Sequence, residues 1–331
     1  MSTEAALVAA IRASPDDDVP RLVYADWLEE NGQTERAEFI RVQCEARRVG
    51  RDSPNYITLL RRSDELCGQY GVDWFGPLND ERYFFRIITE RGFVDSVVIS
   101  ADNFTDYAGL ILEHAPLLKG IHLREAGDWK AFFATFELQG IRSLSFADGV
   151  CTRDAAEELA RSKYLQNLLE LELDRQPLGP DGMAAVAHAS LANLVKLSAS
   201  DCGIGDDGVA ALVARDGFRT LRELDLSENG LTDEACFAMA ETSTFGQLER
   251  LLLCRNLISA AGITALANAS HLRRLRELNL YLNPLGPDGG RAILASRYWG
   301  VLTELNLIGC GVGVTVVKDL RWVHGDAAVK A

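Results

Sequence analysis

Leucines recur at a fixed spacing through the second half of the chain. The phrase L-x-x-L-x-L-x-x-N/C-x-L occurs at intervals of 26, 27, 27, 27 and 27 residues, and its clearest copies read LRELDLSENGL, LERLLLCRNLI and LRELNLYLNPL. The copies open at Leu168, Leu194, Leu221, Leu248, Leu275 and Leu302. The alternating L-x-L predicts a short strand whose leucines lie on one side. The apolar segments that follow, such as DGVAALVA and AGITALAN, predict helices that return the chain to the next strand.

Less regular copies precede these six. They open at Val94, Leu118 and Ile141, so the array is expected to hold about nine units, with irregular ones at its beginning. After the last copy, Val314 to Val323 is expected to form a capping helix, with Trp322 covering the end of the core. Within the array, the helices need residues that satisfy free N–H groups at their starts. Asp206, Thr232, Ser259 and Asp288 are expected to be these N-caps, and Pro180 and Pro287 suit first helical turns.

Apolar residues at helical spacing mark the first 75 residues. The pattern predicts helices over Thr3–Ala13, from Pro20 to Asn31-Gly32, over Thr34–Val49 and over about Tyr56–Tyr70. In the second helix, Leu22, Val23, Trp27 and Leu28 are expected to share one face. Two β-rich runs, 82–89 and 92–99, flank Glu90-Arg91-Gly92 and predict a hairpin or a capping strand pair.

The repeated phrase resembles the leucine-rich repeat family, and its long period with helical returns resembles the ribonuclease-inhibitor-like class. The resemblance implies an α/β solenoid, with a parallel sheet on a concave face and helices on a convex face, preceded by a small helical module. In such repeats an Asn after the strand hydrogen-bonds the loop backbones of neighbouring turns, and Cys is its usual substitute. The residues at this ladder position are Gln176, Cys202, Asn229, Asn256, Asn283 and Cys310.

The segment PRLVYADWLEENGQTERAEFIRVQ, residues 20–43, is similar to the repeat-companion domain that begins many planctomycete-type bacterial repeat proteins. The similarity rests on Tyr24, Asp26, Trp27, Leu28, Glu29, Gly32, Arg36, Glu38 and Phe39. It implies an organisation and no catalytic role. We expect a helical repeat-companion module over 1–75, a β-hairpin or N-terminal cap with the first degenerate repeat over 76–117, and the solenoid with its C-terminal cap over 118–331.

Composition and charge narrow the function classes. The 331 residues are 47% hydrophobic and carry a net charge of -14, which argues against nucleic acid as a main partner because phosphate binding needs clustered Lys and Arg. The N-terminus lacks a basic secretion signal, and no apolar run reaches ~18 residues. Seven cysteines without paired spacing indicate reduced thiols. We expect a bacterial cytoplasmic protein that binds neither nucleic acid nor a membrane.

One motif suggests a nucleotide. Residues 203–208, GIGDDG, match G-x-G-x-x-G between a predicted strand and a predicted helix. The equivalent loops read GLTDEA, LISAAG and PLGPDG and do not repeat it, so the match is expected to be coincidental. The five histidines are scattered without metal-binding spacing. We therefore expect no catalytic, cofactor-binding or metal site.

Residues beside the inward leucines are expected to form rows on the concave face, with strands ~4.8 Å apart. One row reads Glu170, Lys196, Glu223, Arg250, Glu277 and Glu304. Its alternating charges predict either a self-neutralising ladder or a surface that recognises a partner. Further rows are acidic in the middle of the array, at Glu172, Asp174 and Asp225, and become apolar toward its C-terminal end.

The apolar end is the candidate partner-binding surface. It comprises Arg250, Leu252, Cys254, Arg255, Glu277, Asn279, Tyr281, Leu282 and Ile308. Exposed apolar residues reduce solubility unless something covers them, so a protein or peptide, the C-terminal cap or a second copy is expected there. The expected function is non-catalytic protein binding or scaffolding on the concave face. One alternative is a two-module adaptor that recruits one protein through its N-terminal helices. Another is an enzyme in the N-terminal module that uses acids such as Asp26 and Glu29.

Overall fold

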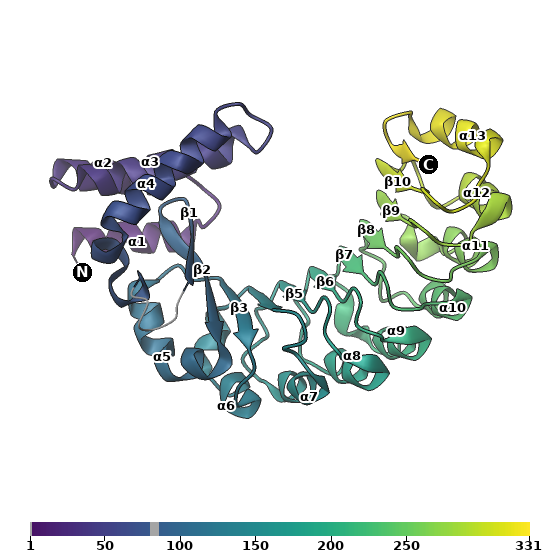
Figure 1. Ribbon diagram of the computed structural model, residues 1–331, viewed down its shortest axis with the longest axis horizontal. Coiled ribbons are helices and arrows are strands. Elements are labelled where there is room, and N and C mark those ends of the chain that lie inside the picture. The colour runs from purple at the N-terminus through teal and green to yellow at the C-terminus, as the bar shows by residue number, and fades with distance from the viewer. Residues whose placement is uncertain (1, 80–85) are drawn as a thin grey trace. The chain divides into compact units, whose positions relative to one another are not determined.

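The computed structural model describes residues 2–79 and 86–331, and the chain forms two compact units, Met1–His122 and Leu123–Ala331. The first unit contains the helices α1 (Thr3–Ala13), α2 (Val19–Glu30), α3 (Thr34–Val49), α4 (Tyr56–Phe75) and α5 (Ala101–His114), with the strands β1 (Arg86–Glu90) and β2 (Phe93–Ser100) (Figure 1). Strand β3 (Gly120–Glu125) contains the boundary between the units. The division into three domains stays a prediction.

The predicted bounds of α1 and α3 are confirmed, whereas α4 continues to Phe75 instead of ending near Tyr70. Its last turn is held by aromatic packing. The Trp74 and Phe75 rings lie 5.1 and 6.2 Å from the ring of Phe39 on α3. This tertiary contact outweighs the weak helix propensity of Gly71.

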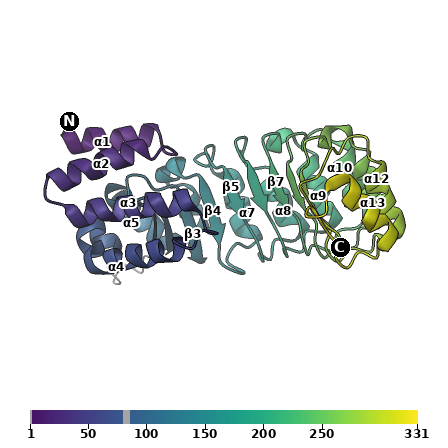
Figure 2. The same cartoon turned by 90° about the horizontal axis from the view of Figure 1, so that it is seen from above.

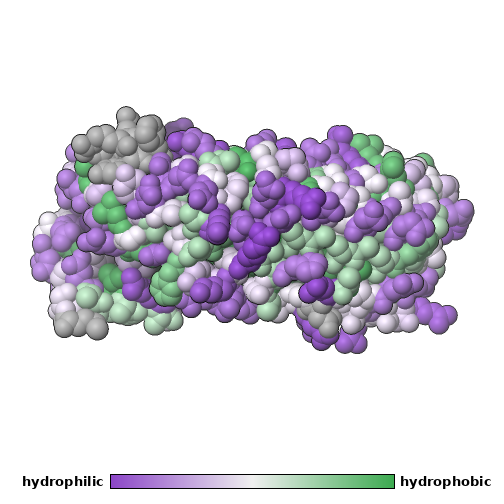
Figure 3. Space-filling view, turned by 90° about the horizontal axis from the view of Figure 1, so that it is seen from below, coloured by the Kyte–Doolittle hydropathy of each residue, from purple (hydrophilic) through white to green (hydrophobic). Residues whose placement is uncertain are grey.

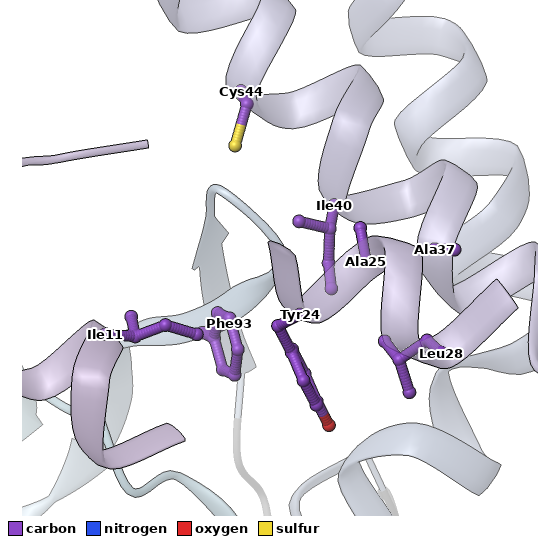
Figure 4. Close-up of a cluster of buried hydrophobic side chains, with 8 residues drawn as sticks. All are labelled: Ile11, Tyr24, Ala25, Leu28, Ala37, Ile40, Cys44 and Phe93. Atoms are coloured by element: carbon purple, nitrogen blue, oxygen red, sulfur yellow. The ribbon is translucent and has the colours of Figure 1, made fainter. Parts of the chain in front are cut away.

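The face of α2 that carries Leu22, Val23, Trp27 and Leu28 is buried only in part. Leu22 and Val23 are exposed, whereas Leu28 is buried together with Arg21, Tyr24 and Ala25. The Tyr24 ring stacks on Trp27 and on Phe93, with centroids 6.0 and 5.8 Å away. Burying this large aromatic rotates the helix away from the face that its small aliphatic residues define. Figure 4 shows the resulting core, which also contains Ile11, Ala37, Ile40 and Cys44.

The hairpin is confirmed for the residues that the structure describes. Strands β1 and β2 pair antiparallel, with Glu90 opposite Phe93. Residues 82–85 of the expected first strand lie outside the described residues. In the turn, Arg91 and Gly92 have φ angles of 49° and 87°. Gly92 is required for a second reason, since a Cβ there would lie 2.2 Å from Cγ1 of Ile40.

The second unit alternates short strands with helices. The strands are β4 (Ser143–Phe146), β5 (Glu170–Glu172), β6 (Lys196–Ser198), β7 (Glu223–Asp225), β8 (Arg250–Leu252), β9 (Glu277–Asn279), β10 (Glu304–Asn306) and β11 (Val329–Lys330). The helices are α6 (Trp129–Phe133), α7 (Arg153–Arg161), α8 (Gly179–Ala187), α9 (Gly205–Val213), α10 (Asp233–Glu241), α11 (Ala260–Ala267), α12 (Gly286–Ala295) and α13 (Val314–His324). From β4 to β11, consecutive strands pair in parallel. The expected α/β solenoid is confirmed.

Within this unit the strands form one layer and the helices the other (Figures 1 and 2). The middle leucine of each strand is fully buried between the two layers, as Leu171, Leu224 and Leu278 illustrate. Figure 3 shows the helical side, where hydrophilic side chains cover much of the surface. None of the described helices has both the length and the apolar composition that crossing a membrane requires.

Two of the four expected N-caps are confirmed. The hydroxyl oxygens of Thr232 and Ser259 accept hydrogen bonds from backbone N–H groups in the first turns of α10 and α11. Asp206 and Asp288 lie inside first turns instead. Both carboxylates still suit the positive end of a helix. The sequence pattern misplaced their helix starts because glycines open those two helices. Pro180 and Pro287 do lie in first turns.

The expected capping helix is present as α13, but the predicted role of Trp322 is wrong. Trp322 is 91% exposed, and Val316, Leu320 and His324 are buried in its place. The reason is helical spacing, since these three residues lie four apart on one face whereas Trp322 lies on another.

His324 makes the cap sensitive to acid. Its Nδ1 accepts a hydrogen bond from the backbone N–H of Leu302 at 3.0 Å, and burial lowers the pKa of the ring below its ordinary value. Because the unfolded chain takes up the proton first, stability is full above the ordinary histidine pKa and falls as pH drops below ~6.5. Intrinsic amide exchange slows from pH 7 to pH 5, so the measured quantity is the protection factor, and we expect the protection factors of α13 amides to fall over this range. The control is His188→Gln, at an exposed histidine, which is expected to leave this pH dependence intact. A His324→Gln chain that keeps the same pH dependence would contradict the assignment.

Candidate functional site

The charged row lies on successive strands in register. Lys196 is opposite Glu170 and Glu223, and Arg250 is opposite Glu223 and Glu277. The Arg250 guanidinium pairs with Glu223 at 2.9 Å and with Glu277 at 2.6 Å. The Lys196 ammonium instead reaches the neighbouring row, where it pairs with Glu172 at 2.5 Å. Much of this row is therefore neutralised within the chain, which favours the ladder interpretation.

The acidic middle of the sheet face is held by local hydrogen bonds. Asp174 accepts from the hydroxyl of Ser198 at 2.6 Å and from the backbone N–H of Ser200 at 3.0 Å. Asp225 accepts from the N–H of Ser227 at 2.9 Å, and burial raises the pKa of its carboxyl. These acids hydrogen-bond the turns after their strands, so less of their negative charge is available to a partner.

The same rows become apolar farther along. At the position of Asp225 the next strand carries Leu252, in direct register. Beyond the strands, Tyr281 and Ile308 stand where earlier repeats have Ser200 and Ser227. Leu282 and Ile308 are 41% and 45% exposed, and Leu252, Cys254 and Tyr281 are half-buried. The apolar end thus comes from the strands β8 and β9 and from the turns that follow β8, β9 and β10.

Polar groups border this apolar end. The Arg255 guanidinium lies 5.5 Å from the centroid of the Tyr281 ring, in cation–π geometry. Asn279 accepts a hydrogen bond from the N–H of Tyr281 through its side-chain oxygen at 3.2 Å. Leu282 has a φ of 57°, a left-handed conformation that bulky residues rarely adopt. All six turns from Arg175 to Gly309 share this conformation at the same repeat position, so the repeat geometry imposes it and holds the Leu282 side chain outward.

The ladder residues lie in the interior and join neighbouring turns. The Asn229 side-chain oxygen accepts from the N–H groups of Cys202 and Ile204, and its amide donates to the carbonyls of Ala199 and Ser227. Asn256 and Asn283 make equivalent bonds. Where the residue is a cysteine, the thiol donates to a carbonyl, as Cys202 does to Leu173 and Cys310 to Leu280.

The cysteines show the properties of structural thiols. All seven are free. Burial raises the pKa of Cys254 in the apolar end and raises that of Cys202 to about 12. Because the thiolate is the nucleophilic form, neither residue is poised for covalent chemistry at neutral pH.

The glycines of residues 203–208 have packing reasons. Gly203 and Gly205 adopt φ angles of 64° and 57°. A Cβ on Gly208 would lie 2.7 Å from Cβ of Ile204. The turn conformation and the close contact of Gly208 with Ile204, the N-cap of α9, explain the motif without a phosphate. Among the described residues, no cluster of three or more His, Cys, Asp or Glu side chains forms a metal site.

The acids of the N-terminal module serve its helix packing. Asp26 and Glu29 on α2 both pair with Arg41 on α3 at 2.7 Å, and Glu38 pairs with Arg62 on α4 at 2.7 Å. A cavity of about 300 Å³ in this unit is lined by groups such as Gln43, Arg47 and Glu90. Glu90 is the one carboxylate among its described lining residues, and it pairs with Arg47.

Sequence reasoning missed a second set of bonds between repeats. Asp206 accepts from the N–H and hydroxyl of Thr232, and Asp233 accepts from the same groups of Ser259. Each acid therefore fixes the helix start of the next repeat. The signal was present in the sequence as an Asp followed by a Thr or Ser 26 residues later.

Part of the second unit matches a family of known proteins. The Leucine Rich repeat model matches residues 190–213, 219–240 and 271–294. No curated protein matches the sequence. Among solved structures, an internalin from Listeria monocytogenes has 17% identity and a TM-score of 0.33 over 60% of this chain, which spans 63% of that chain.

Two further solved structures show a similar likeness. One is of Rad7 and Elc1 in complex, from yeast, with 15% identity and a TM-score of 0.45 over 97% of this chain and 84% of that one. The other is of a TLR13–ssRNA13 complex, with 17% identity and a TM-score of 0.36 over 61% of this chain and 35% of that one. The matched repeats and the observed strand–helix units identify the fold of the second unit as a leucine-rich-repeat solenoid.

Proposed function

We propose that this chain is a non-catalytic protein-binding scaffold that holds a partner protein or peptide on the strand face of its solenoid. The observation that carries the proposal is the apolar end, where Leu252, Tyr281, Leu282 and Ile308 replace the polar residues of earlier repeats. Leu282 and Ile308 are substantially exposed at positions that the repeat geometry fixes. Rigid, exposed apolar groups with a tyrosine among them are typical of binding hot spots.

The charged border suggests how the partner is oriented. Arg250 already pairs with Glu223 and Glu277. We therefore expect its side chain to contribute to the shape of the surface more than to its charge. Arg255 is half-exposed, and its nearest acid, Glu228, lies 3.9 Å away. Arg255 and Asn279 remain for hydrogen bonds at the rim, around an apolar centre. A partner segment with one or two large apolar side chains beside an acidic or amide group fits this arrangement.

The test is a paired substitution in the full chain. We expect Tyr281→Ala with Ile308→Ala to weaken binding of a partner captured from native lysate by roughly 100-fold, because each lost hot-spot side chain is worth about 1–2 kcal/mol. Isothermal titration with the purified partner measures the loss. Trp322→Ala with Val323→Ala is the matched control, since it also removes two exposed apolar side chains from the same unit. Equal affinities of the two double variants would contradict the proposal.

A two-module adaptor is the second candidate, and one observation favours it. Val19, Leu22 and Val23 form an exposed apolar strip on α2 of the first unit. A captured protein whose binding depends on Leu22 and Val23, and is unaffected by Tyr281→Ala with Ile308→Ala, would favour the adaptor. The free state of all seven cysteines agrees with a reducing environment. The residues behind the resemblance to a repeat-companion domain, such as Tyr24, Trp27 and Arg36, pack within the first unit. This packing supports a structural role for that module.

A further inference from the structure

Basic residues gather on one edge of the solenoid although the chain is acidic. Seven segments lead from a helix to the next strand between α6 and β10: 134–142, 162–169, 188–195, 214–222, 242–249, 268–276 and 296–303. Together they contain nine Lys or Arg and three Asp or Glu. The whole chain has 34 basic and 48 acidic residues. The edge at which the strands start, here called the strand-start edge, therefore has the opposite charge balance to the rest of the molecule.

Three arginines of the segment 268–276 lie close together without an ion-pair partner among the described residues. Arg273, Arg274 and Arg276 are exposed and make no ion pair or side-chain hydrogen bond with any residue that the structure describes. The helix dipole does not explain them, because α11 is capped at Asn268, and Arg273 follows five residues later. Several acids lie instead in the first turns of the helices, as Asp206 and Asp233 do.

The strand register places further basic groups beside them. Backbone hydrogen bonds link Arg222 to Glu249 and Glu249 to Arg276, so the three directly precede the successive strands β7, β8 and β9. Arg222 pairs with Glu249 at 2.9 Å, which leaves Arg276 uncompensated. Arg142 lies on the same row, since its carbonyl accepts from the N–H of Leu169. From Arg142 to Arg276 the row crosses five strand spacings, or about 24 Å.

Two open cavities follow this row. One, of about 410 Å³, is lined by Arg273, Arg274, Arg276, Glu249 and Val301. The other, of about 550 Å³, includes Arg142, Arg219, Arg222, Leu169 and Val195. Each thus combines several guanidinium groups with an apolar floor. No aromatic side chain belongs to the described lining of either cavity, so neither offers the stacking platforms that single-stranded nucleic acids use.

We propose that the strand-start edge binds an acidic protein segment, separately from the apolar end of the strand face. Guanidinium forks bind carboxylates through paired hydrogen bonds, and the apolar floors accommodate the aliphatic stems between them. An extended segment of about eight residues, at ~3.3 Å per residue, spans the row from Arg142 to Arg276. The segment's acids meet Arg273, Arg274 and Arg276 at one end and Arg142 at the other.

Fluorescence anisotropy of a labelled octaglutamate peptide tests the proposal on the full chain. Arg273→Gln with Arg274→Gln and Arg276→Gln is expected to weaken binding by roughly tenfold or more, since three charge-assisted contacts are lost. Arg153→Gln with Arg161→Gln and Arg291→Gln removes the same charge from exposed helix positions and is expected to change binding by less than about twofold. The matching triple substitution of Arg273, Arg274 and Arg276 by lysine keeps the charge. It is expected to lower the affinity about threefold, because lysine lacks the forked guanidinium group.

Three results would overturn the proposal. The first is no octaglutamate binding at low ionic strength. The second is an equal loss in the edge triple and the helix triple, which would indicate unspecific attraction. The third is tighter, edge-dependent binding of a single-stranded oligonucleotide of eight nucleotides, which would assign the edge to nucleic acid. Tyr281→Ala with Ile308→Ala is expected to leave peptide binding unchanged, so failure of this inference and failure of the scaffold proposal are distinguishable.

Discussion

Replacing Arg36 with alanine is expected to lower the unfolding free energy of the first unit by about 3 kcal/mol, because a cavity, a lost hydrogen bond and lost cation–π contacts add up. Arg36 is buried, and its guanidinium lies 4.9 to 5.7 Å from the ring centroids of Phe39, Trp74, Phe75 and Phe93. It donates to the carbonyl of Gly92 at 2.5 Å. Burial lowers its pKa to about 10, so it stays charged at neutral pH. One side chain therefore joins α3, α4 and the hairpin.

Hydrogen exchange of α3 amides, with urea denaturation, measures this effect. Arg41→Ala on the same helix is the control, since Arg41 forms partly exposed ion pairs and is expected to contribute less than about 1 kcal/mol. Arg36→Met keeps most of the volume without the charge, so it is expected to fall between them. Equal losses in Arg36→Ala and Arg41→Ala would contradict the central position of Arg36.

Asn229→Leu is expected to destabilise the second unit by about 2–3 kcal/mol, because leucine leaves buried backbone groups without partners. The lost bonds are those from the N–H groups of Cys202 and Ile204 and those to the carbonyls of Ala199 and Ser227. Stacked repeats depend on each interface, so unfolding is expected to begin at this repeat. Thermal melting by circular dichroism measures the loss.

Asn193→Leu is the control for the ladder. Asn193 is exposed and donates one side-chain hydrogen bond, to the carbonyl of Gln166 at 2.8 Å. Its replacement is expected to cost less than about 1 kcal/mol. If the Asn229→Leu chain has the same melting temperature as the parent protein, the ladder hydrogen bonds do not hold the turns together.

The repeat was predictable because it is periodic. A single register, read from the leucines, placed every strand from β5 to β10 and the charged row on consecutive strands. Features set by single contacts were harder to predict. The face of α2 depends on how Tyr24 packs against Phe93, and the length of α4 depends on Trp74 and Phe39. These partners are far apart in sequence, so no local pattern reports them.

The candidate site was predictable only where its residues follow the repeat register. Rows on the strand face follow from the register, so the apolar residues from Leu252 to Ile308 were grouped correctly on neighbouring strands and turns. The strand-start edge was not recognised, because its arginines lie at a variable position of the repeated phrase, as Arg222 and Arg276 do, or just before the phrase, as Arg273 and Arg274 do. Net charge also concealed them, since an overall value of -14 does not show where charges of each sign collect.

The central claim is that a partner occupies the apolar end of the strand face. Its most direct test is photo-crosslinking with benzoylphenylalanine placed at Tyr281 or, separately, at Trp322, which is more exposed but lies on α13. After irradiation in native lysate and mass spectrometry, we predict one specific adduct from position 281 that Ile308→Ala strongly reduces, and none of the same mass from position 322. The same adduct from both positions, or its formation undiminished in the Ile308→Ala chain, would contradict the account.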